Sequence, residues 1–272
     1  MTSIEISLAG RTFVVAGAGG GGIGTAAAYT LRAAGARVVG LDIDPERLAM
    51  ADVDVAHVAD VRDASSVEAA LDDVGPVDGL VYVAGGLRVD QWAPTERLAL
   101  ESFDDVLALN LRAALSTSQL VAAQLVAASR PGTIVYIASI AALQAMPYGA
   151  AYAVAKAGVL ALTRTQAVEW GRAGIRVNAI AAGTTRTPKS ESENASNRPE
   201  DMATIPLGRR GDASEVADAA LFLSSDLSSF VTGHVLVVDG GASVKPSFVD
   251  ADNLPVFVRD PEMRARIIGV TD

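Results

Sequence analysis

A tyrosine and a lysine stand four residues apart in the segment AYAVAKAG, and together they could move a proton. The alanine-rich surroundings predict a helix, so Tyr152 and Lys156 should share one face of it. An ammonium held near a phenol favours the phenolate and lowers the pKa of the tyrosine from its usual value of about 10. Such a tyrosine can pass a proton to or from a substrate oxygen. Because helices also carry such pairs by chance, a catalytic role depends on what accompanies the pair.

Two further polar residues lie where they could act together with the tyrosine–lysine pair. Ser139 ends the apolar stretch GTIVYIAS, and Asn110 lies within the helical pattern FDDVLALNLRAAL. Open parallel sheets bind ligands at the carboxyl ends of their strands, and asparagine is disfavoured inside a helix without a partner. Each residue also has a structural explanation, Ser139 as a cap and Asn110 as a hydrogen-bonded buried amide. Their joint presence with the tyrosine and the lysine favours a catalytic group of four.

A glycine-rich loop, VVAGAGGGGIGTA, follows the first apolar stretch. Glycines between a strand and a helix let backbone N–H groups approach a pyrophosphate, whose charge the helix dipole also favours. Gly17, Gly19 and Gly22 fit the dinucleotide pattern G-x-G-x-x-G, whereas Gly17, Gly22 and Gly24 fit a looser one. A triphosphate-binding loop is excluded because no Lys-Ser/Thr pair follows the last glycine. The loop therefore predicts dinucleotide binding.

An acidic residue indicates which of the two dinucleotides, NAD or NADP, the chain should bind. Asp42 ends the stretch RVVGLD, 20 residues after Gly22. A carboxylate there can accept hydrogen bonds from the ribose hydroxyls of NAD and repel the 2′-phosphate of NADP. The alternative is a solvated acidic turn, since Asp44 and Pro45 follow. We expect NAD as the cofactor, with NADP the less favoured alternative.

Short β-rich stretches alternate with longer helical ones along the chain. The strands are apolar on both faces, which predicts a parallel sheet covered on both sides. We therefore expect an α/β, doubly wound fold of the Rossmann type, with residues 1–242 as one domain. The polar stretch 184–204 is typical of a lid. Residues 243–272 form a C-terminal extension for which the sequence indicates no role.

The composition limits the classes of molecule that the protein can be expected to bind. The 272 residues are 50% hydrophobic and carry a net charge of −10, which argues for a packed globular protein and against a nucleic-acid or membrane-surface partner. There is no cysteine and there are only two histidines, so we expect neither a disulfide nor a metal site. The N-terminal residues lack the pattern of a signal peptide, and we expect a cytoplasmic location.

These features together resemble the short-chain dehydrogenase/reductase family. The resemblance runs in unbroken order from about residue 8 to residue 242, and it adds the segments ADVRD, IRVNAIAAGTTRTP and HVLVVDGG to the residues above. It implies a three-layer αβα domain with about seven strands. It also identifies the loop as that family's T-G-x-x-x-G-x-G pattern, with Gly22 and Gly24 as the last two glycines.

The resemblance implies a role for each catalytic position. Tyr152 would be the general acid/base, and Lys156 would lower its pKa and bind the nicotinamide ribose. Ser139 would hydrogen-bond the substrate oxygen, and Asn110 would hold a water in a proton relay to Lys156.

The same resemblance implies a set of cofactor contacts. Asp60 and Val61 match residues that contact adenine, and Thr187 matches the threonine that contacts the nicotinamide carboxamide. The full set of expected cofactor-binding residues is Gly17, Gly22, Ile23, Gly24, Asp42, Asp60, Val61, Ala84, Gly85, Tyr152, Lys156, Gly183, Thr185 and Thr187.

The chain departs from the family pattern in three places. Ala16 replaces the usual threonine, and the glycine loop is one residue longer than usual. Tyr82 and Val83 replace an Asn-Asn pair whose side chains brace the sheet in the family. Ala182 replaces the usual proline before the lid. None of these changes touches the four catalytic positions.

We therefore expect an NAD-dependent oxidoreductase that interconverts a secondary alcohol and a ketone. The alternatives are an NADPH-dependent 3-oxoacyl thioester reductase and a non-catalytic dinucleotide-binding sensor. We expect a homotetramer, since members of this size commonly form tetramers or dimers. Candidate apolar walls for a small-molecule substrate come from two segments, with the residues Gln144, Met146, Tyr148, Met202, Ile205 and Pro206.

Overall fold

The computed structural model describes residues 6–188, 203–247, 249–251, 253–256 and 258–268. Its main sheet is parallel and has seven strands in the order β3-β2-β1-β4-β5-β6-β9. Their bounds are β1 Thr12–Ala16, β2 Arg37–Asp42, β3 Val55–Val58, β4 Gly79–Tyr82, β5 Gly132–Ser139, β6 Ile175–Ala182 and β9 Val235–Val238. The expected doubly wound α/β fold is confirmed.

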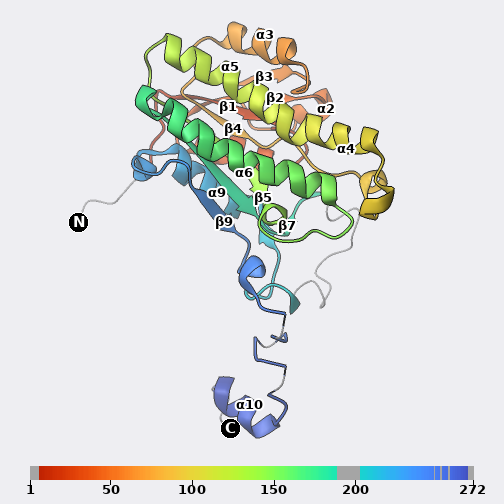
Figure 1. Cartoon of the computed structure of the whole chain (residues 1–272). Helices are drawn as coiled ribbons and strands as arrows, with labels where there is room; N and C mark the ends of the chain where they lie inside the picture. Colours follow the sequence, from red (N-terminus) through yellow and green to blue (C-terminus); the bar gives the residue numbers. More distant parts are fainter. Residues whose placement is uncertain (1–5, 189–202, 248, 252, 257, 269–272) are drawn as a thin grey trace, which may run out of the picture.

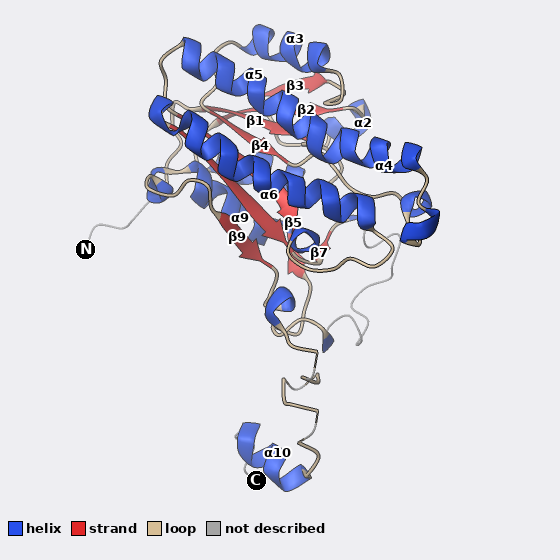
Figure 2. Cartoon of the chain, viewed as in Figure 1, coloured by secondary structure: helices blue, strands red, loops and turns tan. Residues whose placement is uncertain are grey.

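Helices cover both faces of this sheet, as Figures 1 and 2 show. The helices are α1 Ile23–Ala33, α2 Pro45–Leu48, α3 Ala64–Val74, α4 Leu100–Leu107, α5 Ala113–Ala127, α6 Ala150–Trp170, α9 Ala213–Ser224 and α10 Pro261–Ile268. Successive side chains of β1 alternate between the two layers because a strand has a period of two. Val14 packs in the core under α3, α5 and α6, whereas Phe13 and Val15 pack in the core under α1 and α9.

One long helical run combines α4, a single π turn at Ala108–Arg112 and α5. By length and composition, Leu100–Ala127 is the one run among the described residues that could cross a membrane. Its α5 part packs on the sheet, where Ala113, Val121 and Leu125 are buried in the core. We therefore assign it as a core helix. The π turn places Asn110 in its middle.

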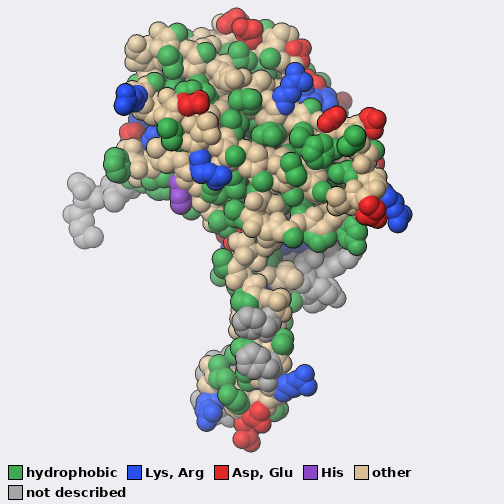
Figure 3. Space-filling view, viewed as in Figure 1, with side chains coloured by type: hydrophobic (Ala, Val, Ile, Leu, Met, Phe, Trp, Pro, Cys, Tyr) green, Lys and Arg blue, Asp and Glu red, His purple; other side chains and the backbone are tan. Residues whose placement is uncertain are grey.

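Two segments leave the main sheet near its carboxyl edge. Thr185–Arg186 (β7) pairs with Gly211–Asp212 (β8) in a small parallel sheet at the base of the expected lid. Residues 189–202 of that lid lie outside the described residues. After β9 the chain turns and continues into α10, which lies away from the body in Figure 1, where the space-filling view of Figure 3 shows a protrusion. An ion pair of 2.7 Å between Arg264 and Asp250 ties α10 to its own extension.

Candidate active site

Two adjoining hollows lie at the carboxyl edge of the sheet, where a doubly wound fold binds its ligands. The larger, of about 530 Å³, is lined by the glycine loop, the end of β2 and residues 59–62. The smaller, of about 320 Å³, is lined by Ser139, Tyr152 and Lys156 among others. Both hollows include Gly85 and Thr187, so they form one continuous groove. The fold thus brings Ser139, Tyr152 and Lys156 together with the expected cofactor residues, whereas Asn110 is in the lining of neither hollow.

The glycine loop needs glycine where its backbone makes close contacts. Gly17 has a φ of +85°, and a Cβ on it would lie 2.7 Å from the backbone nitrogen of Ala84. A Cβ on Gly24 would lie 1.8 Å from the carbonyl oxygen of Gly17. No side chain fits at either position, so α1 starts directly against the end of β1. This is the close backbone approach that a pyrophosphate site requires.

The extra residue of the loop is folded onto Asp42 and Thr25. The N–H of Gly19 donates to Oδ2 of Asp42 at 2.9 Å. The N–H of Gly21 donates to Oγ1 of Thr25 at 3.0 Å, and that hydroxyl donates to the carbonyl of Ala18 at 2.7 Å. Asp42 therefore holds the lengthened loop in addition to facing the groove, a second role that its sequence position did not indicate.

The end of the groove where the resemblance predicts adenine is built from paired charges. Arg62 donates to both carboxylate oxygens of Asp60, at 2.8 and 3.1 Å, and these hydrogen bonds hold the pKa of Asp60 below its usual value. Arg88 donates to Asp105 at 2.9 Å on the same side. Asp60 is thus a fixed anion beside Val61, which is 5% exposed. This position fits the expected contact with an adenine amino group.

Lys156 is buried between α6 and β5. It is 3% exposed, and its Nζ donates to the carbonyl of Ile137 at 2.9 Å. Burial lowers the pKa of Lys156 to about 8. Nζ lies 5.5 Å from the ring centroid of Tyr152, so the predicted proximity of the two side chains is found.

The pKa of Tyr152 moves opposite to our expectation. Burial raises it above its usual value, and the hydrogen bond with Ser139 opposes that rise. The physical reason is that the partly buried ring desolvates the phenolate, and this outweighs the opposing influence of Ser139. Tyr152 is thus a neutral phenol, an acid able to donate its proton.

Asn110 acts as a clamp between the π turn and the loop after β4. Its Oδ1 accepts from the N–H of Gly86 at 2.8 Å. Its Nδ2 donates to the carbonyls of Gly86 and Val106, both at 2.9 Å. Both amide hydrogens are therefore used, and a water would have to donate to the second lone pair of Oδ1 or bind a backbone carbonyl. The relay role of Asn110 stays a prediction.

Tyr82 supplies a brace that the sequence analysis missed. Its hydroxyl donates to the carbonyl of Leu109, inside the π turn, at 3.1 Å. Its ring meets Tyr136 edge to face at 6.3 Å. The departure from Asn-Asn at positions 82 and 83 was the available signal, but nothing in the chain order shows that Tyr82 reaches Leu109. The tyrosine links β4 to the turn that carries Asn110.

The start of the lid crosses the glycine loop. The N–H of Gly183 donates to the carbonyl of Val238 at 2.9 Å, and the hydroxyl of Thr185 donates to the carbonyl of Gly183 at 3.1 Å. A Cβ on Gly22 would lie 3.5 Å from Cγ2 of Thr187. Thr187 therefore faces the groove, as the cofactor assignment requires.

Of the residues expected to line the substrate on the lid side, Ile205 is not available. Ile205 is 4% exposed, and a Cβ on Gly240 would lie 2.8 Å from its Cγ2, so Ile205 packs inward rather than facing a substrate. Pro206 similarly lies against Gly241. Met202 lies outside the described residues. On the other side, Gln144 and Tyr148 are exposed.

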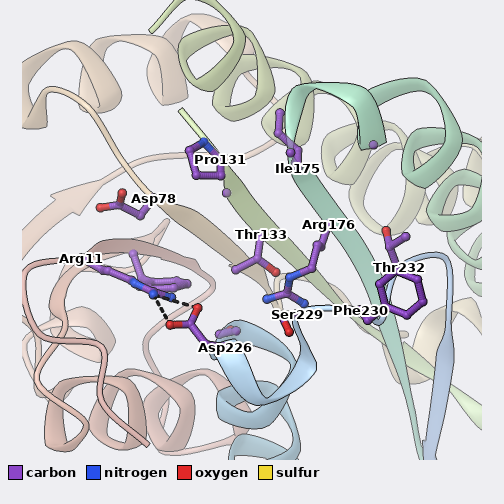
Figure 4. Close-up of a pocket in the computed structure, with 15 residues that line it drawn as sticks. Arg11, Asp78, Pro131, Thr133, Ile175, Arg176, Asp226, Ser229, Phe230 and Thr232 are labelled. Atoms are coloured by element: carbon purple, nitrogen blue, oxygen red, sulfur yellow. Dashed lines mark hydrogen bonds and ion pairs between the residues drawn. The ribbon is translucent and has the colours of Figure 1, made fainter. Parts of the chain in front are cut away.

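A separate hollow of about 550 Å³ lies at the amino edge of the sheet (Figure 4). Arg11 donates to both oxygens of Asp226, and Arg176 donates to the carbonyls of Leu223 and Ser225. Arg11 and Arg176 therefore already have partners, and none of the four catalytic candidates lines this hollow.

Comparisons with known proteins now identify the family. Residues 17–243 match the family described as enoyl-(acyl carrier protein) reductase. A solved short-chain type dehydrogenase/reductase from Mycobacterium ulcerans superposes with a TM-score of 0.81 at 32% identity, with 88% of this chain and 92% of that chain covered. The chain belongs to the short-chain dehydrogenase/reductase family.

Two further relatives connect the family to its chemistry. L-xylulose reductase of Bos taurus is 37% identical over 245 residues, covering 88% of this chain and 98% of that protein. A structure from Agrobacterium tumefaciens, described as a candidate 2-deoxy-D-gluconate 3-dehydrogenase with bound NADP, has a TM-score of 0.80 at 36% identity and covers 88% of this chain and 98% of its own. As a member of the short-chain dehydrogenases/reductases, the protein is an NAD(P)-dependent oxidoreductase that acts on the alcohol–ketone pair.

Proposed function

We propose that this short-chain dehydrogenase/reductase uses NAD to interconvert a secondary alcohol and a ketone, with Tyr152 as the general acid/base. The observation that carries the proposal is the placement of Tyr152, Ser139 and buried Lys156 in one hollow that continues into the glycine-loop groove. A nicotinamide dinucleotide, when bound there, supplies or accepts the hydride. Gly17, Gly22, Ile23, Gly24, Ala84 and Gly85 would hold it by close backbone contact, and Gly183, Thr185 and Thr187 would border its nicotinamide end.

The catalytic side chains would have separate roles in substrate binding and proton transfer. Ser139, hydrogen-bonded to Tyr152, would fix the substrate oxygen, and the neutral phenol of Tyr152 would donate its proton to a ketone oxygen. The ammonium of Lys156 would stabilise the phenolate that remains, because its Nζ is buried and lies 5.5 Å from the centroid of the Tyr152 ring. In the oxidative direction, the same phenolate would take the proton of the alcohol.

The choice of NAD rests on Asp42. Its carboxylate lines the groove next to the glycine loop, where the 2′-phosphate of NADP would meet a negative charge. Arg47 also lines this groove, but it is ion-paired with Asp44 at 3.2 Å. We therefore favour NAD, although one relative binds NADP.

The two alternatives find less support. A 3-oxoacyl thioester reductase is compatible with the matched family description, but Asp42 disfavours NADPH, and the segment 140–149 beside Ser139 contains no charged residue for the phosphates of a carrier group. A non-catalytic sensor would not need Lys156 buried beside Tyr152, which costs stability.

We further propose a cytoplasmic homotetramer in which residues 1–242 form the catalytic domain and 243–272 an extension. The exposed edge strand β9 and the exposed Phe230 beside it are compatible with subunit contacts. Light scattering should give about four times the 27.9 kDa of one chain. A mass equal to one chain would contradict the tetramer.

The function is tested by following absorbance at 340 nm with NADH and NADPH in parallel. The substrate panel should contain cyclic and open-chain ketones together with a 3-oxoacyl thioester. NADH turnover on a simple ketone supports the proposal. Turnover of the thioester with NADPH alone would replace it by the first alternative, and NADH binding without any turnover by the second.

Asp42→Asn should shift the cofactor preference toward NADP. The change removes the charge and keeps one oxygen that can accept from the N–H of Gly19, which holds the loop, while the bond from the N–H of Asp44 to Oδ1 is lost. We expect the ratio of kcat/KM for NADP to that for NAD to rise about tenfold, because one like-charge repulsion of about 1–2 kcal/mol in a partly solvated site is removed. Asp72→Asn, the same charge change on the exposed side of α3, is the control. An unchanged ratio would reduce Asp42 to holding the loop.

A further inference from the structure

Two tyrosines lie side by side in the core that the sheet forms with α5 and α6. Tyr82 ends β4, and Tyr136 is its register partner on β5, with the two rings edge to face. The two residues are 2% and 0% exposed, and burial raises the pKa of both phenols, so both keep their protons. A buried hydroxyl without an acceptor would cost the desolvation of its O–H group. Each phenol donates to an acceptor, but the two acceptors lie in different parts of the fold.

The acceptor of Tyr82 is a carbonyl in the π turn. In an α-helix the N–H of Ala113 would donate four residues back, to the carbonyl of Leu109. In the turn Ala108–Arg112 this N–H donates five residues back instead, to the carbonyl of Ala108. The hydroxyl of Tyr82 donates to the carbonyl of Leu109 at 3.1 Å. A side chain of β4 thus supplies a donor at the point where the π turn departs from the α-helical pattern.

The acceptor of Tyr136 lies away from the site. Its hydroxyl donates to Oε1 of Gln166 at 2.6 Å, and Nε2 of Gln166 donates to Oγ of Ser118 at 3.0 Å. The hydroxyl of Ser118 donates in turn to the carbonyl of Leu115 at 2.8 Å. None of these four residues is in the lining of either hollow at the carboxyl edge. Tyr136 therefore shares the burial and the ring contact of Tyr82 without its bond to the π turn.

The π turn is connected to the catalytic hollow through Asn110. The side chain of Asn110 holds both the N–H and the carbonyl of Gly86. A Cβ on Gly85 would lie 2.6 Å from Oδ1 of Asn110 and 3.3 Å from Nζ of Lys156. Gly85 thus lies close to both groups with no side chain of its own, and it lines both hollows. The position of Asn110 consequently affects the backbone beside Lys156 directly.

We propose that Tyr82 is a positioning residue of this enzyme: its hydroxyl fixes the π turn, so that Asn110 holds the backbone of Gly85 and Gly86 in place beside Lys156. The inference rests on the proposed alcohol–ketone chemistry. It gives a function to the first of the two positions at which the chain departs from the Asn-Asn pair of its family. Tyr82 is in the lining of neither hollow, so it acts on the reaction through these residues.

Tyr82→Phe tests the inference by single-turnover kinetics. Enzyme in excess over NADH is mixed with a saturating concentration of the ketone from the panel above that turns over fastest, and absorbance at 340 nm is followed. We expect the rate constant to fall about tenfold, because a small misplacement of the groups around the reacting atoms raises the barrier. Unfolded molecules bind no NADH, so a mere loss of folded protein would not lower this rate constant.

Tyr136→Phe is the matched control. It removes a hydroxyl from an equally buried ring on the neighbouring strand and takes from Gln166 its donor. Both variants should unfold at a lower urea concentration than the wild type, since each loses one buried hydrogen bond. Only Tyr82→Phe should lose rate. An amine in place of the hydroxyl, introduced as 4-aminophenylalanine at position 82, can still donate to Leu109 and should restore the rate constant to within about threefold of the wild type.

The outcomes separate this inference from the proposed function. Rate constants of the two phenylalanine variants that agree within about twofold would overturn the inference and leave the proposed function standing. An amine that restores nothing would overturn it in the same way, because donation to Leu109 would then not be what sets the rate. If the wild-type enzyme turns over none of the ketones in the panel, the proposed function fails and this inference fails with it.

Discussion

Tyr152→Phe is expected to lower kcat by about 10²–10⁴-fold and to leave NAD binding nearly intact. The change removes one oxygen atom from a ring that stays packed between Ser139 and Lys156. The ring still fills its place, but no group remains that can pass a proton to the substrate oxygen. The measurement is kcat from cofactor absorbance, with Kd for NADH from fluorescence titration.

The matched control is Tyr29→Phe, the same change on an exposed position of α1. It should retain wild-type kcat. If Tyr152→Phe kept more than about a tenth of the wild-type kcat, another group would have to supply the proton, and the assignment of Tyr152 would be wrong.

Lys156→Met is expected to make the protein more stable and nearly inactive. The ammonium of Lys156 is buried with one carbonyl partner, and burial lowers its pKa from 10.5 to about 8. Such a shift corresponds to about 3 kcal/mol of destabilisation by the charged form. Methionine fills similar space without the charge, and loss of the hydrogen bond to Ile137 offsets about 1 kcal/mol. We expect a net gain of about 2 kcal/mol, with kcat reduced at least about 10²-fold.

The pH dependence separates this explanation from a packing effect. A base whose pKa is lower in the folded state is destabilising below that folded pKa, and the penalty fades as pH rises from about 8 to 10.5, the pKa of the unfolded chain. Urea unfolding should therefore show the largest gain for Lys156→Met below pH 8 and a small loss, of about 0.5 kcal/mol, at pH 10.5, where the lost hydrogen bond to Ile137 outweighs what is left of the charge penalty. A gain that does not change with pH would point to packing alone, and a loss of stability below pH 8 would contradict the buried charge.

The sequence was sufficient to predict the arrangement of the site at the level of elements. The alternation of buried strands and helices predicts which strand ends meet, and so it predicts that Ser139 lies near the glycine loop. The helical spacing of Tyr152 and Lys156 predicts that they share a face. These inferences depend on local periodicity and on the handedness of parallel crossovers, which a single chain expresses directly.

What the sequence did not predict depends on contacts between distant residues. The pKa of Tyr152 rises because the fold buries its ring, and burial cannot be deduced from the nearby Lys156. The hydrogen bond from Tyr82 to Leu109 joins residues 27 apart, through a π turn that has no clear sequence signal. Ile205 directly follows the lid in sequence but packs against Gly240 in space.

The lengthened glycine loop is another case in which the sequence did not predict contacts between distant residues. The sequence shows that the glycine loop is one residue longer than the family pattern. That the added length is bonded to Asp42 and Thr25 follows only from the folded position of β2 beside β1. Asp42 consequently has two roles, and a test of cofactor preference has to preserve the bond to Gly19.

Hydride transfer is tested most directly by isotope tracing. The enzyme is incubated with NADH carrying deuterium at the transferable position of C4 and with the cyclic ketone that turns over fastest, and the product is analysed by mass spectrometry and NMR. We predict an alcohol with one deuterium on the carbinol carbon and a hydroxyl proton from solvent, formed at the rate at which NADH is consumed. An alcohol without deuterium, or NADH consumption without alcohol, would contradict the proposed reaction.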